Sequence, residues 1–475
     1  MKELSRRSFL SGVGLTTAAV VLGACAPKPS AQPTQAPAPS GATAAPKAPA
    51  TKTKVAIQTS WFAQPEPGRD FWQRAIKMFE EKPENADITI ELINVATTPQ
   101  DVMAAIAGGT SPCIYHMYGG TTGTFNVLEF APKGVAVQLD EFIATSKYIK
   151  MDEYLPGQWD NVTWNNKIWG LPVTEGGPGG PAMTWHKRYF AEAGLDPDKG
   201  PKTWDDCIDI AKKLTKYAPD GSIDIEGYDP LDSMGQGLGF WAGAFESMFI
   251  SDDKKTMLFD QGNWVLALET ISAIYHALGP AKMQAHKDAW PYWTGPKSGF
   301  PNGKRAMIAN GYWQPGELRD SMADKSWKIG YDYVPCIVPG KKWAQAPGGH
   351  TLWMTKWCKT RNEAWRFMDY IMSEEIAIME FKLRGGFVYT KSLAKKLDIT
   401  GYPGLEFFFK LPETVDVMYR PAQFTSPIGA ETTQLWRRAI EEVNYDKKQP
   451  KQALLDINAE LQKSLDRANE ATKTS

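Results

Sequence analysis

Aromatic and hydrogen-bonding residues in glycine- and proline-rich loops are the part of this sequence best suited to bind a small molecule. The chain contains 18 Trp and 17 Tyr, more than a core needs. Indole and phenol rings offer flat apolar faces, whereas carboxylates, amides and imidazoles exchange hydrogen bonds with hydroxyls. The candidate binding residues are Trp61, Gln64, Glu66, His116, Tyr118, Glu175, Trp241, Trp313, Gln314, Gly349 and His350. This mixture predicts a ligand with an apolar face and a rim of hydroxyls, a description that fits a sugar.

Motifs of covalent, metal or nucleotide chemistry are missing from the sequence. No GxSxG, HExxH, CxxC or Walker pattern occurs, and GQGLG at 235–239 does not complete a dinucleotide fingerprint. His276 and His286 stand too far apart for one helical turn to bring them together. We therefore expect no enzyme, no cofactor and no metal. Carboxylates are plentiful, so a secreted carbohydrate-active enzyme with an acid pair stays open as an alternative.

The first residues have the layout of a secretory signal. Arg6 and Arg7 precede an apolar stretch at 9–24, which is shorter than the ~20 residues that a membrane-spanning helix needs. SRRSFL at 5–10 resembles the twin-arginine export motif, although Ser11 stands where that motif often carries Lys, so general secretion stays open. LGAC at 22–25 resembles a bacterial lipobox. We expect residues 1–24 to be a signal peptide and Cys25 to be the lipidated first residue of the mature chain.

Residues 25–53 are expected to form a tether between this lipid and a folded body. The segment is almost entirely Ala, Pro, Thr, Ser, Gln and Lys, so it cannot bury enough apolar surface to offset its ordering entropy. Two or three acyl chains would hold such a protein stably at a membrane. The expected location is therefore extracytoplasmic, at the outer face of the cell membrane or in the periplasm.

Charge and cysteine content narrow the class further. The net charge is −1, which makes nucleic acid an unsuitable partner. After the tether, Cys113, Cys207, Cys336 and Cys358 allow three disulfide connectivities. Cys207 falls on the apolar face of a predicted helix, which indicates a core position, whereas Cys336 and Cys358 flank one segment and are candidates for a pair. The pairing stays open at this point.

Strands and helices alternate in the first part of the body. Residues 54–59, 87–95 and 113–118 have the pattern of strands, and 69–82 and the segment after 99–101 have that of helices. Capping-box spacing at 203–206 and 360–363 predicts two further helix starts, and the tail from Glu431 is expected to form two helices broken near Pro450. This alternation predicts α/β architecture with largely parallel sheets. GGPGGP at 176–181 fits either a boundary between lobes or a surface loop.

Several stretches resemble, in order, the bacterial extracellular solute-binding proteins of the sugar-binding, maltose-binding-protein-like group. They are NKIWGLP at 166–172, WHKRYFAEAGLDP at 185–197, PKTWDD at 201–206, KRAMIANGYW at 304–313, and GGHTLWM at 348–354 followed by NEAWRFM at 362–368. PKTWDD is the most specific of them. The extra glycines and prolines at 176–181 depart from the family pattern.

This resemblance implies two α/β lobes joined by crossing segments, with the ligand in the cleft between them. Lobe 1 would comprise 54–174 and 335–381, and lobe 2 would comprise 175–334 and 382–475. Loops at the carboxyl ends of the strands would carry the candidate residues, with Trp313 at a family position that commonly stacks on the ligand. The closed, monomeric protein would dock on ABC permease subunits that work with a separate ATPase. A non-sugar ligand, such as a polyamine, a phosphate ester or a peptide, stays open.

Overall fold

The computed structural model describes residues 51–59, 68–93, 99–118, 127–174, 177–292, 297–346, 348–387 and 389–473. Its first part alternates strands and helices, as the sequence predicts. The elements are β1 (Thr53–Thr59), α1 (Gly68–Glu80), β2 (Ile88–Ile93), α2 (Pro99–Ala107) and β3 (Ile114–Tyr118). None of the described helices is long and apolar enough to cross a bilayer.

The first sheet has five strands in the order β2-β1-β3-β13-β6. Strand β1 is parallel to β2 and β3, whereas β13 (His350–Met354) runs antiparallel to β3 and to β6 (Leu171–Val173). His350, the first residue of β13, therefore lies opposite Tyr118 and Val173, the last residues of β3 and β6. This pairing brings distant parts of the sequence together at the carboxyl edge of the parallel strands.

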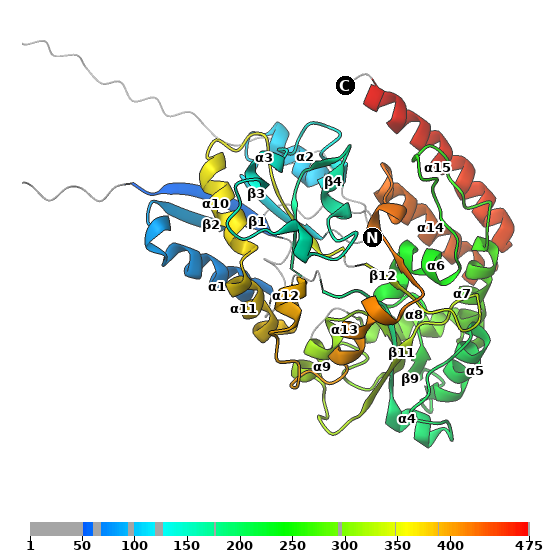
Figure 1. Cartoon of the computed structure of the whole chain (residues 1–475). Coiled ribbons are helices and arrows are strands. Elements are labelled where there is room, and N and C mark those ends of the chain that lie inside the picture. Colours follow the sequence, from blue (N-terminus) through cyan, green and yellow to red (C-terminus); the bar gives the residue numbers. More distant parts are fainter. Residues whose placement is uncertain are drawn as a thin grey trace, which may run out of the picture. The chain divides into compact units, whose positions relative to one another are not determined.

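Three helices build the core against this sheet. α1 buries Phe71, Trp72, Ala75 and Phe79, which recur at helical spacing and form one apolar face. The face packs on α10 (Arg361–Ile371) and α11 (Glu374–Arg384), where the rings of Phe79 and Phe367 meet edge to face at 5.2 Å. Figure 1 shows α1, α10 and α11 grouped beside β1 and β2.

The second sheet is mixed, with strand order β11-β7-β10-β9-β8. Strands β9 (Ile223–Tyr228) and β10 (Arg305–Asn310) are parallel, but β7 (Ala182–His186) runs antiparallel to β10 and to β11 (Ile329–Tyr333). β8 (Lys216–Tyr217) pairs antiparallel with β9. The prediction of a mostly parallel sheet is thus wrong for the second sheet, because β7 lies between β10 and β11 and runs antiparallel to both of them. Its register places Ala182 beside both Asn310 and Tyr333.

A second, larger core forms around helices that cover this sheet. Its helices are α5 (Trp204–Leu214), α6 (Leu238–Ala244), α7 (Trp264–Leu278), α14 (Gly429–Asn444) and α15 (Pro450–Lys473). The capping box at the start of α5 is confirmed, since Thr203 accepts from the Asp206 amide and the Asp206 side chain accepts from the Thr203 amide. Cys207 is fully buried in this core, as predicted.

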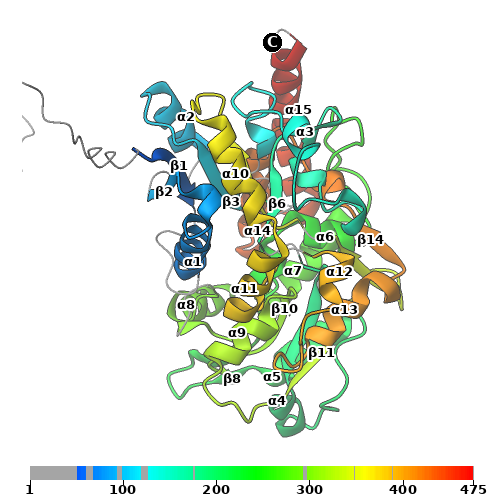
Figure 2. The same cartoon turned by 60° about the vertical axis from the view of Figure 1, so that its left-hand side comes forward.

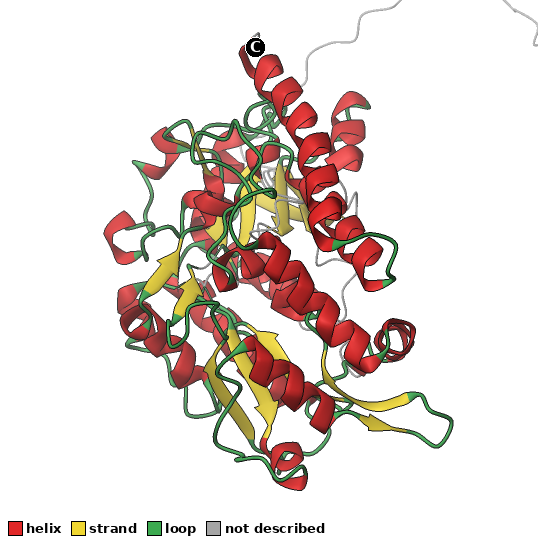
Figure 3. Cartoon of the chain, turned by 90° about the vertical axis from the view of Figure 1, so that its right-hand side faces the viewer, coloured by secondary structure: helices red, strands yellow, loops and turns green. Residues whose placement is uncertain are grey.

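The two predicted tail helices are confirmed as α14 and α15, which pack side by side. The second begins at Pro450, a residue that fits the first turn of a helix because its missing N–H has no partner there in any case. Figure 3 shows α15 as the long red helix that ends at the C-terminus.

The remaining α-helices and strands of the described chain lie between these elements. They are α3 (Asp140–Ile143), β4 (Thr163–Trp164), β5 (Lys167–Ile168), α4 (Lys187–Glu192), α8 (Pro280–Ala289), α9 (Gln314–Ser321), β12 (Trp343–Gln345), α12 (Lys391–Ala394), α13 (Leu405–Thr414) and β14 (Val417–Tyr419). Strand β12 pairs with β14 outside both five-stranded sheets. A third apolar cluster joins α11 and α13 to the edge of the second sheet through Phe381, Phe408 and Tyr312.

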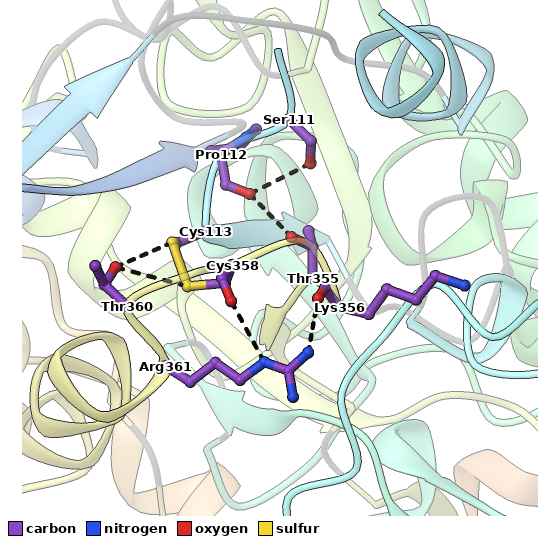
Figure 4. The surroundings of a disulfide bond; sticks show 8 residues. All are labelled: Ser111, Pro112, Cys113, Thr355, Lys356, Cys358, Thr360 and Arg361. Carbon is purple, nitrogen blue, oxygen red and sulfur yellow. Dashed lines mark hydrogen bonds between the residues drawn. A yellow bond between two sulfur atoms is a disulfide. The ribbon is translucent and has the colours of Figure 1, made fainter. Parts of the chain in front are cut away.

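A disulfide joins Cys113, just before β3, to Cys358, just after β13 (Figure 4). Cys336 and Cys207 are free and buried. The suggested pair of Cys336 with Cys358 is therefore wrong. Because β3 and β13 are neighbours in the first sheet, their ends bring Cys113 and Cys358 together, whereas Cys336 belongs to the second core.

The predicted capping box at 360–363 does not form either. Thr360 precedes α10 but its side chain caps no helical amide. Its hydroxyl lies 3.4 Å from Sγ of Cys113 and 3.8 Å from Sγ of Cys358 (Figure 4). The Thr360 hydroxyl therefore contacts the sulfur atoms of the disulfide instead of capping α10, as the sequence pattern predicted.

Candidate ligand-binding site

The described residues include six of the predicted binding residues, with their side chains where they have one. Trp61, Gln64, Glu66, Glu175 and the lipidation candidate Cys25 lie outside the described residues, and of Tyr118 only the backbone position in β3 is described. The six are His116, Trp241, Trp313, Gln314, Gly349 and His350.

The two predicted histidines stand together at the carboxyl edge of the first sheet. The rings of His116 and His350 are stacked, with centroids 4.8 Å apart and planes 10° apart. His116 Nδ1 lies 2.8 Å from Thr59 Oγ1, and His116 Nε2 lies 3.4 Å from Thr174 Oγ1. The antiparallel pairing of β3 with β13 creates this arrangement, which joins the ends of β1, β3, β6 and β13.

Both imidazoles are held neutral by their surroundings. Burial lowers the pKa of His350 to about 3. Burial also lowers the pKa of His116 well below its usual value, with smaller contributions from His350 and from the positive charge of Arg384. A neutral imidazole offers one donor and one acceptor, and in His116 these face the hydroxyls of Thr59 and Thr174.

The loop before His350 is held from another element. Asn161 Nδ2 donates to the carbonyl oxygen of Gly348 at 2.8 Å. Gly349 follows with a φ of 50°, in the left-handed region that favours glycine. Gly349 therefore lets the chain turn into β13 with His350 at the sheet edge.

Trp313 lies at the corresponding edge of the second sheet, directly after β10. Its indole Nε1–H donates to the hydroxyl oxygen of Tyr292 at 3.2 Å, and the ring stays partly exposed. A Cβ at Gly311 would meet the Trp313 ring at 2.1 Å. Only glycine at 311 therefore permits the indole to lie against the backbone.

A buried polar network holds this tryptophan. The Tyr292 hydroxyl donates to Asn310 Oδ1 at 2.9 Å and lies 3.3 Å from Glu317 Oε2. Burial raises the pKa of Glu317 to about 8, so at neutral pH its protonated carboxyl is able to donate to Tyr292. Ser233 adds a second hydroxyl donor to Asn310 Oδ1 at 2.7 Å. Trp313 is thus fixed through Tyr292 rather than by apolar packing alone.

The network rests on a buried ion cluster at the start of β10. Arg305 Nε donates to Glu226 Oε2 at 2.6 Å, and Arg305 also pairs with Asp232. Asp232 caps the turn that presents Ser233, whose φ of 46° is unusual for a residue other than glycine. Removing one partner of a buried ion pair costs about 3–5 kcal/mol, so this cluster fixes the position of Ser233 and hence of Asn310.

Gln314 carries a buried amide without a partner. The residue is 1 % exposed, and neither side-chain oxygen nor nitrogen has a hydrogen-bond partner in the described part of the chain. The same holds for Asn310 Nδ2. A buried polar group left unpaired costs about 1–3 kcal/mol. Such groups beside a half-buried indole indicate a place where a polar ligand completes the hydrogen bonding.

Helix α9, which begins at Gln314, packs against the end of α11. A Cβ at Gly316 would meet the Arg384 carbonyl oxygen at 2.3 Å, so the backbones of α9 and the end of α11 touch. Figures 1 and 2 both place α9 beside the end of α11. Burial lowers the pKa of Arg384 to about 9, which leaves its guanidinium charged at neutral pH. The positive charge of Arg384 also helps to lower the pKa of His116.

Trp241 occupies a different kind of position. It is 0 % exposed and packs in the second core, with its ring 5.2 Å from Trp204 and its indole N–H donating to the Gly235 carbonyl oxygen at 2.8 Å. No face of this ring is open to a ligand in this structure. From the sequence alone, a tryptophan in a binding loop could not be distinguished from a tryptophan in the core.

Sequence reasoning missed Tyr292, Asn310, Glu317 and Ser233. Asn310 stands inside the motif KRAMIANGYW, where it was visible but had no assigned part. Tyr292 and Ser233 reach the site only through the fold, and nothing in their local sequence marks them. In the described part of the chain no group of three His, Cys, Asp or Glu side chains is placed to hold a metal.

The two five-stranded sheets thus carry His116, His350 and Trp313 at or just beyond the ends of their strands. Residues 74–406 match the family of bacterial extracellular solute-binding proteins, and the chain belongs to this family. The family consists of substrate-binding transport proteins rather than enzymes, and it implies a periplasmic or other extracytoplasmic location.

Curated relatives match over shorter segments. An uncharacterised ABC transporter extracellular-binding protein of Pyrococcus horikoshii is 32% identical over 90 residues, which is 19% of each chain. The sn-glycerol-3-phosphate-binding periplasmic protein UgpB of Escherichia coli is 28% identical over 134 residues, 28% of this chain and 30% of UgpB. The matched segments thus span less than a third of the length of these relatives.

Solved structures share the fold along most of the chain. CpMnBP1 bound to mannobiose superposes with a TM-score of 0.73 at 20% identity, covering 86% of this chain and 99% of that protein. A solute-binding protein of Thermotoga lettingae bound to α-D-tagatose gives 0.67 at 21% identity, with 87% and 100% covered. The sugar-binding protein MalE of Xanthomonas citri gives 0.64 at 18% identity, with 89% and 100% covered. The predicted two-lobed α/β fold is confirmed.

Proposed function

We propose that this protein captures a mono- or oligosaccharide between its two lobes and delivers it to the permease of an ABC importer. The observation that carries the proposal is the half-buried Trp313, held by Tyr292 and followed by the buried, unpartnered amide of Gln314. An indole face stacks on the C–H face of a sugar ring, while amides and neutral imidazoles pair with its hydroxyls. Trp61, Gln64, Glu66, Tyr118 and Glu175 complete the proposed ligand set.

Closure of the lobes around the ligand is the proposed mechanism. The lobes are 54–174 with 335–381, and 175–334 with 382–475. A ligand shifts the equilibrium only by its differential affinity for the closed form, and a change from 1:99 to 99:1 needs about 5.5 kcal/mol. The closed monomer then docks on the permease, which a separate ATPase drives.

A binding screen tests the ligand class. The mature chain is titrated in a thermal-shift assay with mannobiose, maltose and larger oligosaccharides, and with amino acids and spermidine as non-sugar probes. A true ligand at one hundred times its Kd stabilises the folded state by about 2.7 kcal/mol. Stabilisation by at least one carbohydrate, confirmed calorimetrically and without cleavage of the sugar, supports the proposal. Cleaved products would favour a carbohydrate-active enzyme instead.

A phosphate ester of a polyol is the second candidate ligand. Arg384 remains charged at neutral pH and acts on His116, and UgpB, the matched relative, binds sn-glycerol-3-phosphate. The same screen therefore includes sn-glycerol-3-phosphate and free glycerol. Binding of the phosphate ester without binding of any neutral sugar would favour this second candidate.

We also propose that the protein is a lipoprotein attached through Cys25. The disulfide between Cys113 and Cys358 agrees with an oxidising compartment. Expression in a bacterium followed by detergent phase separation tests the anchor. The wild-type protein is expected in the detergent phase, and Cys25→Ser is expected in the aqueous phase. Substituting Arg6 and Arg7 by Lys distinguishes twin-arginine export from general secretion.

A further inference from the structure

A cavity is lined by Thr174, which follows β6 and approaches His116, and otherwise by residues that were not named for the candidate ligand-binding site. It has a volume of about 220 Å³ and lies between α1, α11, α12 and the segment around residues 147–154. Its inner wall is apolar and buried, formed by Phe71, Ile371, Ile376 and Leu393. Neither Trp313 nor Gln314 lines it. It is smaller than the ~300 Å³ at which drug-sized ligand sites begin, so it fits a compact ligand rather than an oligosaccharide.

One buried carboxyl oxygen of a residue that lines this cavity has no partner among the described residues. Glu380 of α11 lines the cavity and is 1 % exposed, and its Oε1 has no hydrogen-bond partner in the described part of the chain. A buried, unpaired ionisable group is costly. In accordance with this cost, burial alone raises the pKa of Glu380 well above its usual value. A strongly perturbed ionisable group that lines a cleft is a candidate for a functional site.

The mouth of the cavity does not select for one charge. Lys147 and Lys150 stand there with Glu153 and Glu374, so the two positive and two negative side chains balance. Lys147, Lys150 and Glu374 are exposed and therefore screened by solvent. The inner carboxyl of Glu380 therefore decides which polar group the cavity accepts.

We infer that this cavity is a second binding site, for a small organic ammonium ion whose carbon body lies on the apolar wall and whose ammonium group pairs with Glu380. An ammonium ion supplies the missing donors as charge-assisted hydrogen bonds. At ~30 Å³ per water-sized volume the cavity has room for roughly seven such volumes, which suits a short alkylammonium. The site is independent of the sugar site in its lining residues, apart from Thr174, which lines the cavity and also approaches His116.

pH provides an independent signature. To bind an ammonium ion, Glu380 must release its proton, so the affinity is expected to rise with pH. The other titratable groups that line the cavity are Tyr148 and Tyr154, together with Lys147, Lys150, Glu153 and Glu374 at its mouth. Hydrogen bonds from Ser392 lower the pKa of Glu153, and burial raises the pKa of Tyr148 and of Tyr154, so these three groups keep their charge state in the neutral range in which the test is made.

The test is calorimetric titration of the folded chain with n-butylammonium, and with 1-butanol as the neutral analogue. We expect n-butylammonium to bind in the millimolar range or tighter with uptake of a proton by the buffer, and 1-butanol to bind at least about tenfold more weakly. Glu380→Gln keeps the volume and removes the charge, and is expected to weaken n-butylammonium at least about tenfold. Glu91→Gln, on the exposed surface of β2, is the matched control and leaves binding unchanged.

A blocking variant keeps the inference testable if Glu380→Gln fails to fold. Ala377 lines the same cavity on α11, so Ala377→Leu fills part of the volume and is expected to abolish n-butylammonium binding. The inference is overturned if n-butylammonium does not bind, if it binds Glu380→Gln as well as wild type, or if 1-butanol binds equally. Carbohydrate affinity measured on the same variants should remain within twofold, so failure here is distinguishable from failure of the proposed function.

Discussion

The indole N–H of Trp313 donates to the hydroxyl of Tyr292 at 3.2 Å, and this bond connects the ring proposed for the ligand to a buried polar network. Tyr292 in turn donates to Asn310, which also accepts from Ser233. The orientation of Trp313 thus depends on residues that do not themselves face the proposed ligand. Substitutions at Tyr292, Asn310 or Ser233 should therefore affect ligand binding.

Tyr292→Phe removes this bond and keeps the ring. One hydrogen bond is worth about 0.5–1.5 kcal/mol, so we expect carbohydrate affinity to fall between about twofold and tenfold. Isothermal titration with the best carbohydrate of the screen measures the change. Tyr217→Phe, at an exposed tyrosine of β8, is the control and should have no effect. Unchanged affinity in Tyr292→Phe would mean that the bond does not orient the ring for binding.

Gln314→Met should separate stability from binding. The substitution replaces a buried, unpartnered amide by an apolar chain of similar length. We expect the ligand-free protein to gain about 1–3 kcal/mol in free energy of unfolding and to lose most of its carbohydrate affinity. Thermal unfolding and calorimetry measure the two effects. Gln73→Met on the exposed face of α1 is the control. A variant that is destabilised and still binds would contradict the assignment of Gln314.

The disulfide should stabilise the first sheet strongly. Cys113 and Cys358 are 245 residues apart in sequence, and they close a long loop. Removing such a bond typically costs about 2–5 kcal/mol. We expect Cys113→Ala with Cys358→Ala to lower the denaturant midpoint, and dithiothreitol to lower the midpoint of the wild type similarly. The double variant at the free residues, Cys207→Ala with Cys336→Ala, should keep the sensitivity to reductant. If dithiothreitol left the denaturant midpoint of the wild type unchanged, the pairing of Cys113 with Cys358 would be contradicted.

The buried histidine pair should make the folded protein sensitive to acid. His350 takes up a proton near pH 6.5 in the unfolded chain but only near pH 3 in the folded protein. The unfolded state binds more protons between these values, so stability is lost as the pH falls through this window and is fully retained above it. His350→Gln should reduce the pH slope of the unfolding free energy by up to about 1.4 kcal/mol per pH unit.

Denaturant unfolding between pH 7 and pH 4 measures this slope. His276→Gln replaces an exposed histidine and is the control. Equal slopes for the wild type and His350→Gln would show that His350 takes up its proton in the folded state as readily as in the unfolded chain.

Local patterns were sufficient to predict much of the fold. The alternation of strands and helices, the capping box at Thr203 and the break at Pro450 all follow from spacing within a few residues. Cys358 and Thr360 could not be predicted in this way, because their partners lie 245 and 247 residues away and meet them only through the pairing of β3 with β13. Antiparallel β7 was missed for the same reason, since strand direction depends on the path of the whole chain.

The sequence analysis named residues for the candidate site but could not predict how they are arranged in space. His116 and His350 were named separately, and their stacking became evident only from the sheet register. Trp241 shows the limit, because a tryptophan beside glycines is equally compatible with a loop and with a core. The polar network of Tyr292, Asn310 and Glu317 depends on burial, which no short pattern encodes.

The most direct measurement is calorimetric titration of the mature chain and of Trp313→Ala with the carbohydrate panel. We predict that at least one mono- or oligosaccharide binds the wild type with a dissociation constant in the micromolar range or tighter, and that Trp313→Ala weakens it at least about tenfold, since a ring contact of this kind is worth about 1–3 kcal/mol. If no carbohydrate binds the wild type, or if Trp313→Ala binds it equally well, the account of this protein as a sugar-binding member of its family is contradicted.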